Sequence, residues 1–143
     1  MKTVAMKTLA LALTFAAATT VGGFALAPSP AQASGNALVF EVNPTTRAEA
    51  RAVRRGLAQL SGQNGTGGGA HVRQNGSNNG AAISQNGRGS TAVVQQYGNG
   101  HTGTVTQRGN NHAYGVFQFG ENTTHHETQQ GQGQTGMTVI IGW

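Results

Sequence analysis

Side-chain amides are the groups whose type and spacing could do the most chemistry in this chain. A glutamine recurs every eleven residues through the C-terminal half of the sequence. An amide carries both hydrogen-bond donors and an acceptor, so identical amides stacked in a column can pair with one another. We therefore expect a self-assembly ladder made by Gln63, Gln74, Gln85, Gln96, Gln107, Gln118 and Gln129.

Catalytic and metal-binding groups are scarce by comparison. The acidic residues are Glu41, Glu49, Glu121 and Glu127, and no nucleophile, base and orienting residue occur in a catalytic pattern. His125 and His126 are adjacent, so on a strand their side chains would point to opposite faces rather than toward one metal ion. The sequence thus predicts neither an enzyme nor a cofactor or metal site.

The residues around each glutamine repeat with the same period. A small residue lies four positions before most glutamines, a β-branched residue usually lies two before, and a glycine lies two after. Because they are spaced by two, the small residue, the β-branched residue and the glutamine lie on one face of a short strand. The glycine begins a turn, and the Gly or Asn four positions after the glutamine continues it. We expect a core column of Val72, Ile83, Val94, Val105 and Val116, and turn glycines at Gly76, Gly87, Gly98, Gly109, Gly120 and Gly131.

These short strands must be positioned by stacking. A strand of about five residues cannot bury one face alone, so successive strands must fold back and lie about 4.8 Å apart. Two eleven-residue units would make one rung of 22 residues, arranged as strand, turn, strand and turn. The predicted fold class is an all-β, two-sheet β-solenoid with a short N-terminal strand and helix.

The repeat resembles that of a known family. The pattern of Gln74, Gly76, Ala81 and Gln85 is similar to the curlin repeat, and the resemblance covers residues 61–143. It implies a secreted subunit that self-assembles into extracellular curli-type amyloid fibres for cell adhesion and biofilm matrix. It also implies partners: further copies of the chain, a nucleator or main curlin subunit, and an outer-membrane export channel. The family's usual Asn five after Gln is present at Asn79 but replaced at Ser90, His101, His112, Thr123 and Gln134, which bears on the turn geometry.

Residues 1–33 have the layout of a secretory signal peptide. Lys2 and Lys7 precede an apolar run, and Ala31-Gln32-Ala33 forms a small-residue cleavage site. The run is interrupted by threonines and glycines, which argues against a membrane anchor. We expect a secreted bacterial protein that begins at Ser34 and, since the chain has no cysteine, lacks disulfides.

Residues 34–60 differ in kind from the repeats. Leu38, Phe40 and Val42 alternate like a short strand, and Thr46 with Glu49 forms a capping box that begins an amphipathic helix. We expect this segment to pack its apolar face on the protein and to cap the first rung, which would leave the Ile140 end as the freer edge. The alternative is a segment recognised during export.

The outward faces of the two predicted sheets differ. One carries an apolar set comprising Tyr97, Phe117, Phe119, Val139 and Ile141. We expect this face either to pack laterally against another fibril or surface, or to be routinely exposed to solvent. The other face carries a row of Ser84, Thr106 and Thr128.

The unit around Gln129 breaks the pattern, because its inward positions are His125 and Glu127. A charged pair there would weaken stacking, either as a gatekeeper against premature aggregation or as a fraying final rung. If the two residues face inward as a pair, assembly should respond to pH as His125 titrates.

Composition limits the remaining classes of function. Charged residues are 9% of the chain, and without the first 33 residues seven Arg face four Glu, which is too sparse for a nucleic-acid surface. Two alternatives to a main fibre subunit stay open. One is a minor or nucleator subunit, favoured by Ile140 in place of a glutamine. The other is a monomeric β-solenoid that binds ice or a polysaccharide through its Ser/Thr row.

Overall fold

The computed structural model describes residues 36–62 and 68–143. The predicted signal peptide, residues 1–33, and Gln63 lie outside these ranges. In the described ranges no helix is long and apolar enough to cross a membrane.

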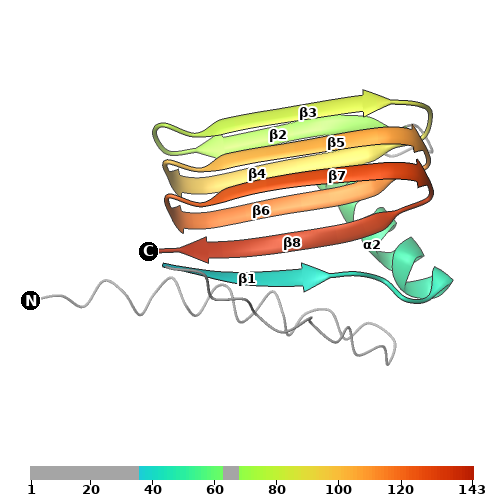
Figure 1. Ribbon diagram of the computed structural model, residues 1–143, viewed down its shortest axis with the longest axis horizontal. Coiled ribbons are helices and arrows are strands. Elements are labelled where there is room, and N and C mark those ends of the chain that lie inside the picture. Colours follow the sequence, from blue (N-terminus) through green and yellow to red (C-terminus); the bar gives the residue numbers. More distant parts are fainter. Residues whose placement is uncertain (1–35, 63–67) are drawn as a thin grey trace, which may run out of the picture.

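The chain folds into two stacked ladders of strands that face each other (Figure 1). A five-stranded sheet has the order β1-β8-β6-β4-β2, and a three-stranded sheet has the order β3-β5-β7. The first consists of β1 (Ala37–Val42), β2 (Gly69–Asn75), β4 (Thr91–Asn99), β6 (Ala113–Glu121) and β8 (Thr135–Gly142). The second consists of β3 (Gly80–Asn86), β5 (Thr102–Asn110) and β7 (Thr124–Gln132).

The register between neighbouring strands follows the repeat. Gln74 lies beside Gln96 in parallel strands, and Gln96 lies beside Gln118, so each strand pairs with the strand 22 residues later. Gln85, Gln107 and Gln129 are aligned in the same way across the other sheet. The predicted two-sheet β-solenoid with 22 residues per rung is therefore confirmed.

The interior between the sheets is built from small and β-branched side chains. Val94, Val105 and Val116 are completely buried, and Ile83 packs against the same cluster. Val72 aligns with Val94 in the expected column, but its side chain is 43% exposed because β2 ends the five-stranded sheet.

Glycine and asparagine fix the path of the chain between strands. Every described residue four after a repeat glutamine has a left-handed φ of 51° to 72°, which only Gly and Asn adopt at little cost. These residues are Asn78, Gly89, Gly100, Asn111, Asn122 and Gly133.

The glycines two after each glutamine take the expected turn position in only part of the chain: Gly76 and Gly87 lie in the bends that follow β2 and β3. Gly98, Gly109, Gly120 and Gly131 lie within strands rather than in turns. They have positive φ, and a Cβ on Gly98 would overlap the carbonyl oxygen of Gly120 in the next rung. Glycine is needed there because backbone approaches backbone.

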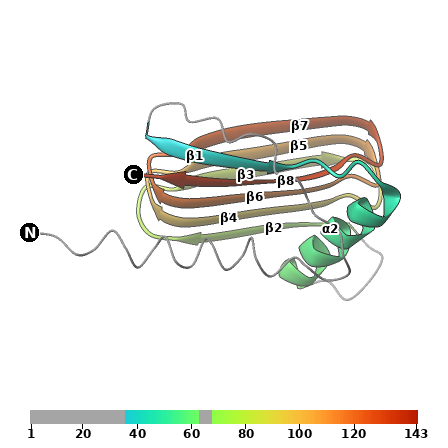
Figure 2. The ribbon, with the colours of Figure 1, turned by 90° about the horizontal axis from the view of Figure 1, so that it is seen from below.

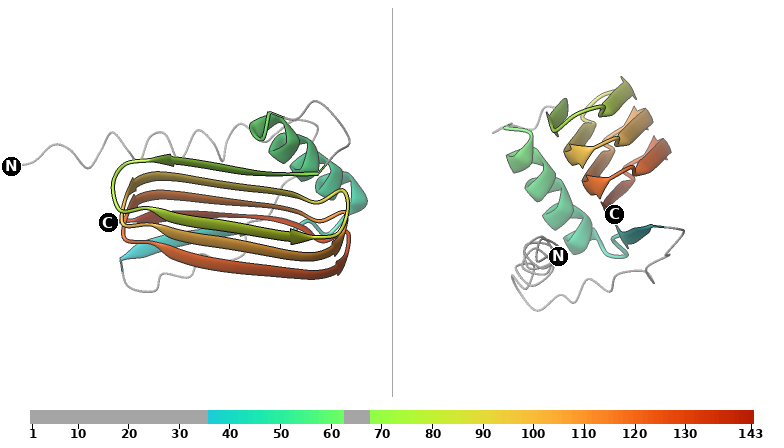
Figure 3. Two further views of the ribbon diagram at one scale, coloured as in Figure 1. Left: turned by 90° about the horizontal axis from the view of Figure 1, so that it is seen from above. Right: turned by 90° about the vertical axis from the view of Figure 1, so that its left-hand side faces the viewer.

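The helix of the described residues, α2 (Arg47–Leu60), crosses the outer face of the five-stranded sheet (Figures 2 and 3). The predicted capping box is present: the Thr46 side chain accepts from Glu49 N at 3.2 Å, and Glu49 Oε2 accepts from Thr46 N at 3.1 Å. The backbone N–H groups of Thr45 and Thr46, which donate to the Glu49 carboxylate, lower the pKa of Glu49. The apolar face of α2 packs on the protein as expected, with Val53 and Leu57 buried.

The expected cap on the first rung is wrong. β1 pairs antiparallel with β8, the last repeat strand, so residues 37–42 cover the Ile140 end of the five-stranded sheet. Figure 1 shows β1 at the end of the stack opposite β2 and β3. The edge strands of the described sheets are therefore β1 and β2 in the five-stranded sheet, and β3 and β7 in the three-stranded sheet.

Candidate functional site

Two continuous columns of glutamine amides run along the inside of the solenoid. In the five-stranded sheet Gln74 Nε2 donates to Gln96 Oε1 at 2.8 Å, and Gln96 donates to Gln118 at 2.8 Å. In the three-stranded sheet Gln85 donates to Gln107 at 2.8 Å, and Gln107 donates to Gln129 at 2.9 Å. Each described repeat glutamine is therefore in one of the two columns.

The amides also tie the two sheets together. Gln96, Gln107 and Gln118 each direct Nε2 to a backbone carbonyl of the opposite sheet, at Gly80, Thr91 and Thr102, over 2.9, 3.1 and 3.0 Å. All three side chains are completely buried. Because a buried amide without partners is costly, these positions require glutamine and also require a neighbouring rung.

Both columns have the same polarity, and their ends differ. Every amide donates toward the C-terminal end of the stack. Gln118 meets Ile140 in β8, and its Nε2 donates instead to the carbonyls of Thr102 and Thr123. The other column ends at Gln129 in β7, the edge strand of its sheet.

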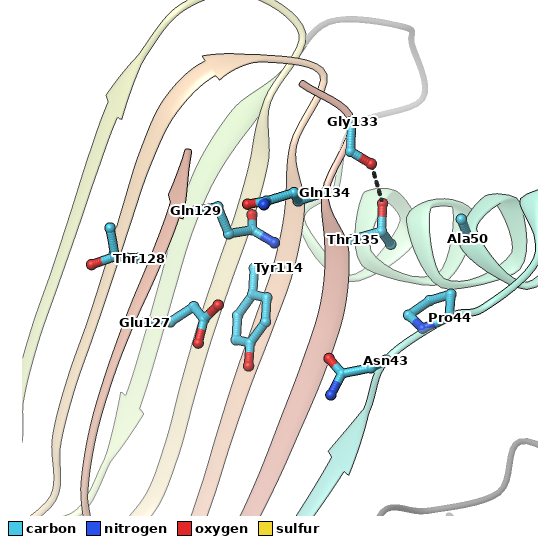
Figure 4. Close-up of a pocket in the computed structure, with 10 residues that line it drawn as sticks. All are labelled: Asn43, Pro44, Ala50, Tyr114, Glu127, Thr128, Gln129, Gly133, Gln134 and Thr135. Atoms are coloured by element: carbon cyan, nitrogen blue, oxygen red, sulfur yellow. Dashed lines mark hydrogen bonds between the residues drawn. The ribbon is translucent and has the colours of Figure 1, made fainter. Parts of the chain in front are cut away.

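An open cavity of about 420 Å³ lies beside Gln129 (Figure 4). Its lining includes Tyr114, Glu127, Gln129 and Gln134. It forms at a step in the structure, because the three-stranded sheet stops at β7 while the five-stranded sheet continues through β8 and β1. The cavity therefore marks the place where a further strand would continue the three-stranded sheet.

Comparison with known proteins agrees with this geometry. Residues 65–98 match the curlin-associated repeat. The chain carries curlin-associated repeats. The match spans β2, β3 and most of β4, and the 22-residue register of the strands continues beyond it as far as β8. No curated protein and no solved structure matches the chain at a significant level.

The last strand of the three-stranded sheet, β7, contains the unusual pair. His125 and Glu127 are both half-buried, on the cavity side of β7, with His125 Nε2 3.9 Å from Glu127 Oε2. Burial lowers the pKa of His125, whereas burial and the nearby Glu41 carboxylate raise the pKa of Glu127. β7 pairs with β5 along its whole length, so this repeat is not frayed in the structure.

Tyr114 completes this end of the interior. Its hydroxyl lies 2.6 Å from Thr138 Oγ1, its ring stacks on that of His125 at 6.4 Å, and burial raises its pKa. Tyr114 stands where the neighbouring curlin-associated repeat has Ala92, so it fills more of the interior at the last rung.

The turns contain two buried polar columns, one in each set of turns, that the sequence analysis did not identify as sites. His101 and His112 are completely buried. The backbone N–H of His101 donates to Asn79 Oδ1 at 3.0 Å, and its Nδ1 lies 2.7 Å from Thr123 Oγ1 one rung later. Their common position five after Gln was the available signal, because residues at one position of the repeat must stack.

No set of three or more potential metal ligands occurs in the described ranges. His125 and His126 lie on opposite faces of β7: His126 Nδ1 is 2.6 Å from Thr104 Oγ1 on the outer surface.

The outward apolar face is not an open surface. Phe117 is only 4% exposed because α2 covers it, and Phe119 and Val139 pack against the same cluster. Tyr97 stacks on Phe119 with ring centroids 5.6 Å apart. The expectation of solvent exposure is therefore wrong for Phe117, and lateral contact through this residue would require α2 to move. Ser84, Thr106 and Thr128 form an aligned row on the outer face of the three-stranded sheet.

Proposed function

We propose that this chain is a secreted structural subunit whose copies stack end to end into an extracellular curli-type amyloid fibre. The observation that carries this proposal is the pair of polar glutamine columns: both start at edge strands, β2 and β3, and the three-stranded column also ends at an edge strand, β7. An edge strand presents unpaired backbone groups that a further strand can satisfy. A second copy is well suited to supply that strand because it carries the same register and the same amides.

The direction of the amides favours stacking with one polarity. Gln129 lies at the end to which the donors point, whereas Gln74 and Gln85 start the described columns with their Oε1 acceptors. A copy stacked at this end would continue the three-stranded column with a glutamine amide beyond Gln129. Copies therefore join head to tail, as parallel strands.

The biological role and partners extend this proposal. We propose a role in adhesion and biofilm matrix, with an outer-membrane export channel and a companion nucleator or main subunit as partners; the match to the curlin-associated repeat supports this role. The signal peptide expected at residues 1–33 supports the extracellular location, and residues 34–60 serve as a cap.

A specific observation supports a second candidate function. The outer face of the three-stranded sheet carries the Ser84, Thr106 and Thr128 row, and α2 contacts the other sheet. A monomeric solenoid could bind ice or a polysaccharide through such a row.

One experiment separates the two functions. Residues 34–143 are diluted from denaturant and followed by amyloid dye binding, electron microscopy and fibre diffraction. We expect fibres whose diffraction shows the inter-strand reflection at about 4.8 Å. A strand-rich monomer that forms no fibres would contradict the fibre proposal and favour the monomeric binder.

A further inference from the structure

β1 is unlike every repeat strand. It has six residues, contains no glutamine and pairs antiparallel, whereas all the other strand pairs described are parallel. It is aligned with β8 over its full length, from Ala37 beside Gly142 to Val42 beside Met137. β1 therefore occupies the β8 edge without continuing the repeat.

Because the two sheets have unequal numbers of strands, a further copy cannot stack on β1 and continue both sheets. With β1 in place one sheet has five strands and the other has three. If β2 of an incoming copy paired with β1, its β3 would lie two strand spacings, or about 10 Å, too far from β7 for continuous pairing. An incoming copy can pair with β8 directly only where β1 is absent.

We propose that residues 36–62, comprising β1 and α2, form a removable intramolecular cap on the edge that the next copy must occupy. The inference rests on the proposed fibre function and concerns its regulation. A second copy of this chain competes with β1 for β8, and growth proceeds when the cap leaves.

The contacts of α2 explain how the cap is held. Val53 and Leu57 are buried against Val93, Ala113 and Phe117. Arg54 reaches the turns that precede β6 and β8, donating to the carbonyls of Asn111 and Gly133, the latter at 3.1 Å, and to Thr135 Oγ1 at 3.0 Å. The helix therefore holds β1 near β8 through a compact apolar contact and one cation.

Gly115 makes this docking possible. It lies between Val93 and Met137 on the outer face of the five-stranded sheet, and a Cβ at this position would force the side-chain ends of Leu57 and Phe117 to shift. Gly115 is not in the left-handed region, so a β-branched side chain suits its strand but not the helix above it.

Release of the cap also reduces the difference in the number of strands between the two sheets. Without β1 the five-stranded sheet keeps four strands, and one strand is then missing beside β7 when a copy stacks on β8. The repeat phase places Gln59 and Ser61 in a unit directly before β2, which belongs to the three-stranded sheet. In the capped structure Gln59 is in α2 and Ser61 is its C-cap. Unwinding this end of the helix in the incoming copy supplies residues for the missing strand.

A disulfide lock tests the proposal, since the chain has no cysteine of its own. Leu38 and Ile141 are partners in the β1–β8 pair, so Leu38→Cys with Ile141→Cys joins the cap to its edge. The matched control, Thr106→Cys with Thr128→Cys, joins two partners within the repeats. Seeded elongation of residues 34–143 is measured by dye binding before and after reduction.

We expect the oxidised lock to elongate at least tenfold more slowly than its reduced form, and the oxidised control to elongate like the wild type. Equal rates for the oxidised and reduced lock would overturn the cap while leaving the fibre proposal intact. Absence of fibres from the wild type as well would instead overturn the fibre proposal, and the cap with it.

A second pair of variants needs no cross-link. Gly115→Val displaces α2, whereas Ala82→Val makes a comparable change on the exposed outer face of the other sheet. We expect Gly115→Val to shorten the lag before unseeded assembly at least twofold and Ala82→Val to leave it unchanged. An unchanged or longer lag for Gly115→Val would contradict the proposal.

Discussion

Gln96 Nε2 lies 2.8 Å from Oε1 of Gln118, a residue 22 positions later, and both side chains are completely buried. The same relationship joins each described repeat glutamine to the next in its column. The folded chain therefore contains, within itself, the contact by which the proposed fibre joins one copy to another.

Replacing Gln96 with leucine should strongly destabilise the folded chain. The change removes the acceptor of Gln74 Nε2, the donor to Gln118 Oε1 and the donor to the Gly80 carbonyl. Each buried group left unpaired costs about 1–3 kcal/mol. Urea unfolding of the monomer measures the loss. The exposed Gln130→Leu is the control, expected to stay within about 0.5 kcal/mol of the wild type; equal losses would show that the column contributes little.

The strand glycines should tolerate no side chain inside the stack. A Cβ on Gly109 would overlap the Gly131 carbonyl oxygen, and its φ is 116°. We expect Gly109→Ala to cost at least about 2 kcal/mol in the free energy of unfolding. Gly56→Ala, in α2 with open space around it, should instead stabilise the chain by about 0.5–1 kcal/mol. Similar effects of the two changes would contradict the role assigned to close backbone approach.

His125 should make the folded chain less stable in mild acid. Its pKa is lowered by burial from 6.5, so the unfolded chain takes up the proton first and stability falls as the pH drops through that value. Glu41, His126, Tyr114 and Glu127 are the titratable groups nearby. We expect His125→Ala to remove part of the stability loss between about pH 7 and pH 5.5, measured as urea midpoints. An unchanged pH dependence would exclude His125 as its source.

Glu127 should act with the opposite sign. Its pKa is raised from 4.5 by burial and by Glu41, so its ionisation costs stability as the pH rises through the raised value. Glu127→Gln should therefore stabilise the folded chain at pH 7 and have little effect below about pH 4. The same urea series measures this change. A loss of stability at pH 7 would instead indicate that the 3.9 Å contact with His125 outweighs the cost of burial.

The parts of the fold that repeat could be predicted from the sequence, because one residue type at one period fixes both the register and the inward face. Gln96 and Val94 illustrate this: their phase alone placed them in the interior. His101 could have been found by the same reasoning, but a histidine in a Gly/Asn-rich turn suggests a surface position unless its column is considered.

The placement of residues 36–62 could not be predicted, because no period links them to the repeats. The alternation of β1 indicates a strand but not its partner, and antiparallel pairing with β8 depends on the fold being complete. The helix could be recognised from Thr46 and Glu49, whereas its docking site depends on a gap at Gly115. The same gap explains why Phe117 is covered rather than exposed.

Gly131→Ala tests the central claim, that copies stack by continuing the columns beyond β7, most directly. Its φ is 100°, but no atom of its own chain lies within 4 Å of the added Cβ, unlike at Gly109. The cost to folding should be limited to about 1–2 kcal/mol of backbone strain, measured by urea unfolding. In a continued stack the new methyl group would overlap the next copy, so seeded elongation should fall at least tenfold. Elongation at the wild-type rate would contradict the account, because the edge of β7 would then not be where copies join.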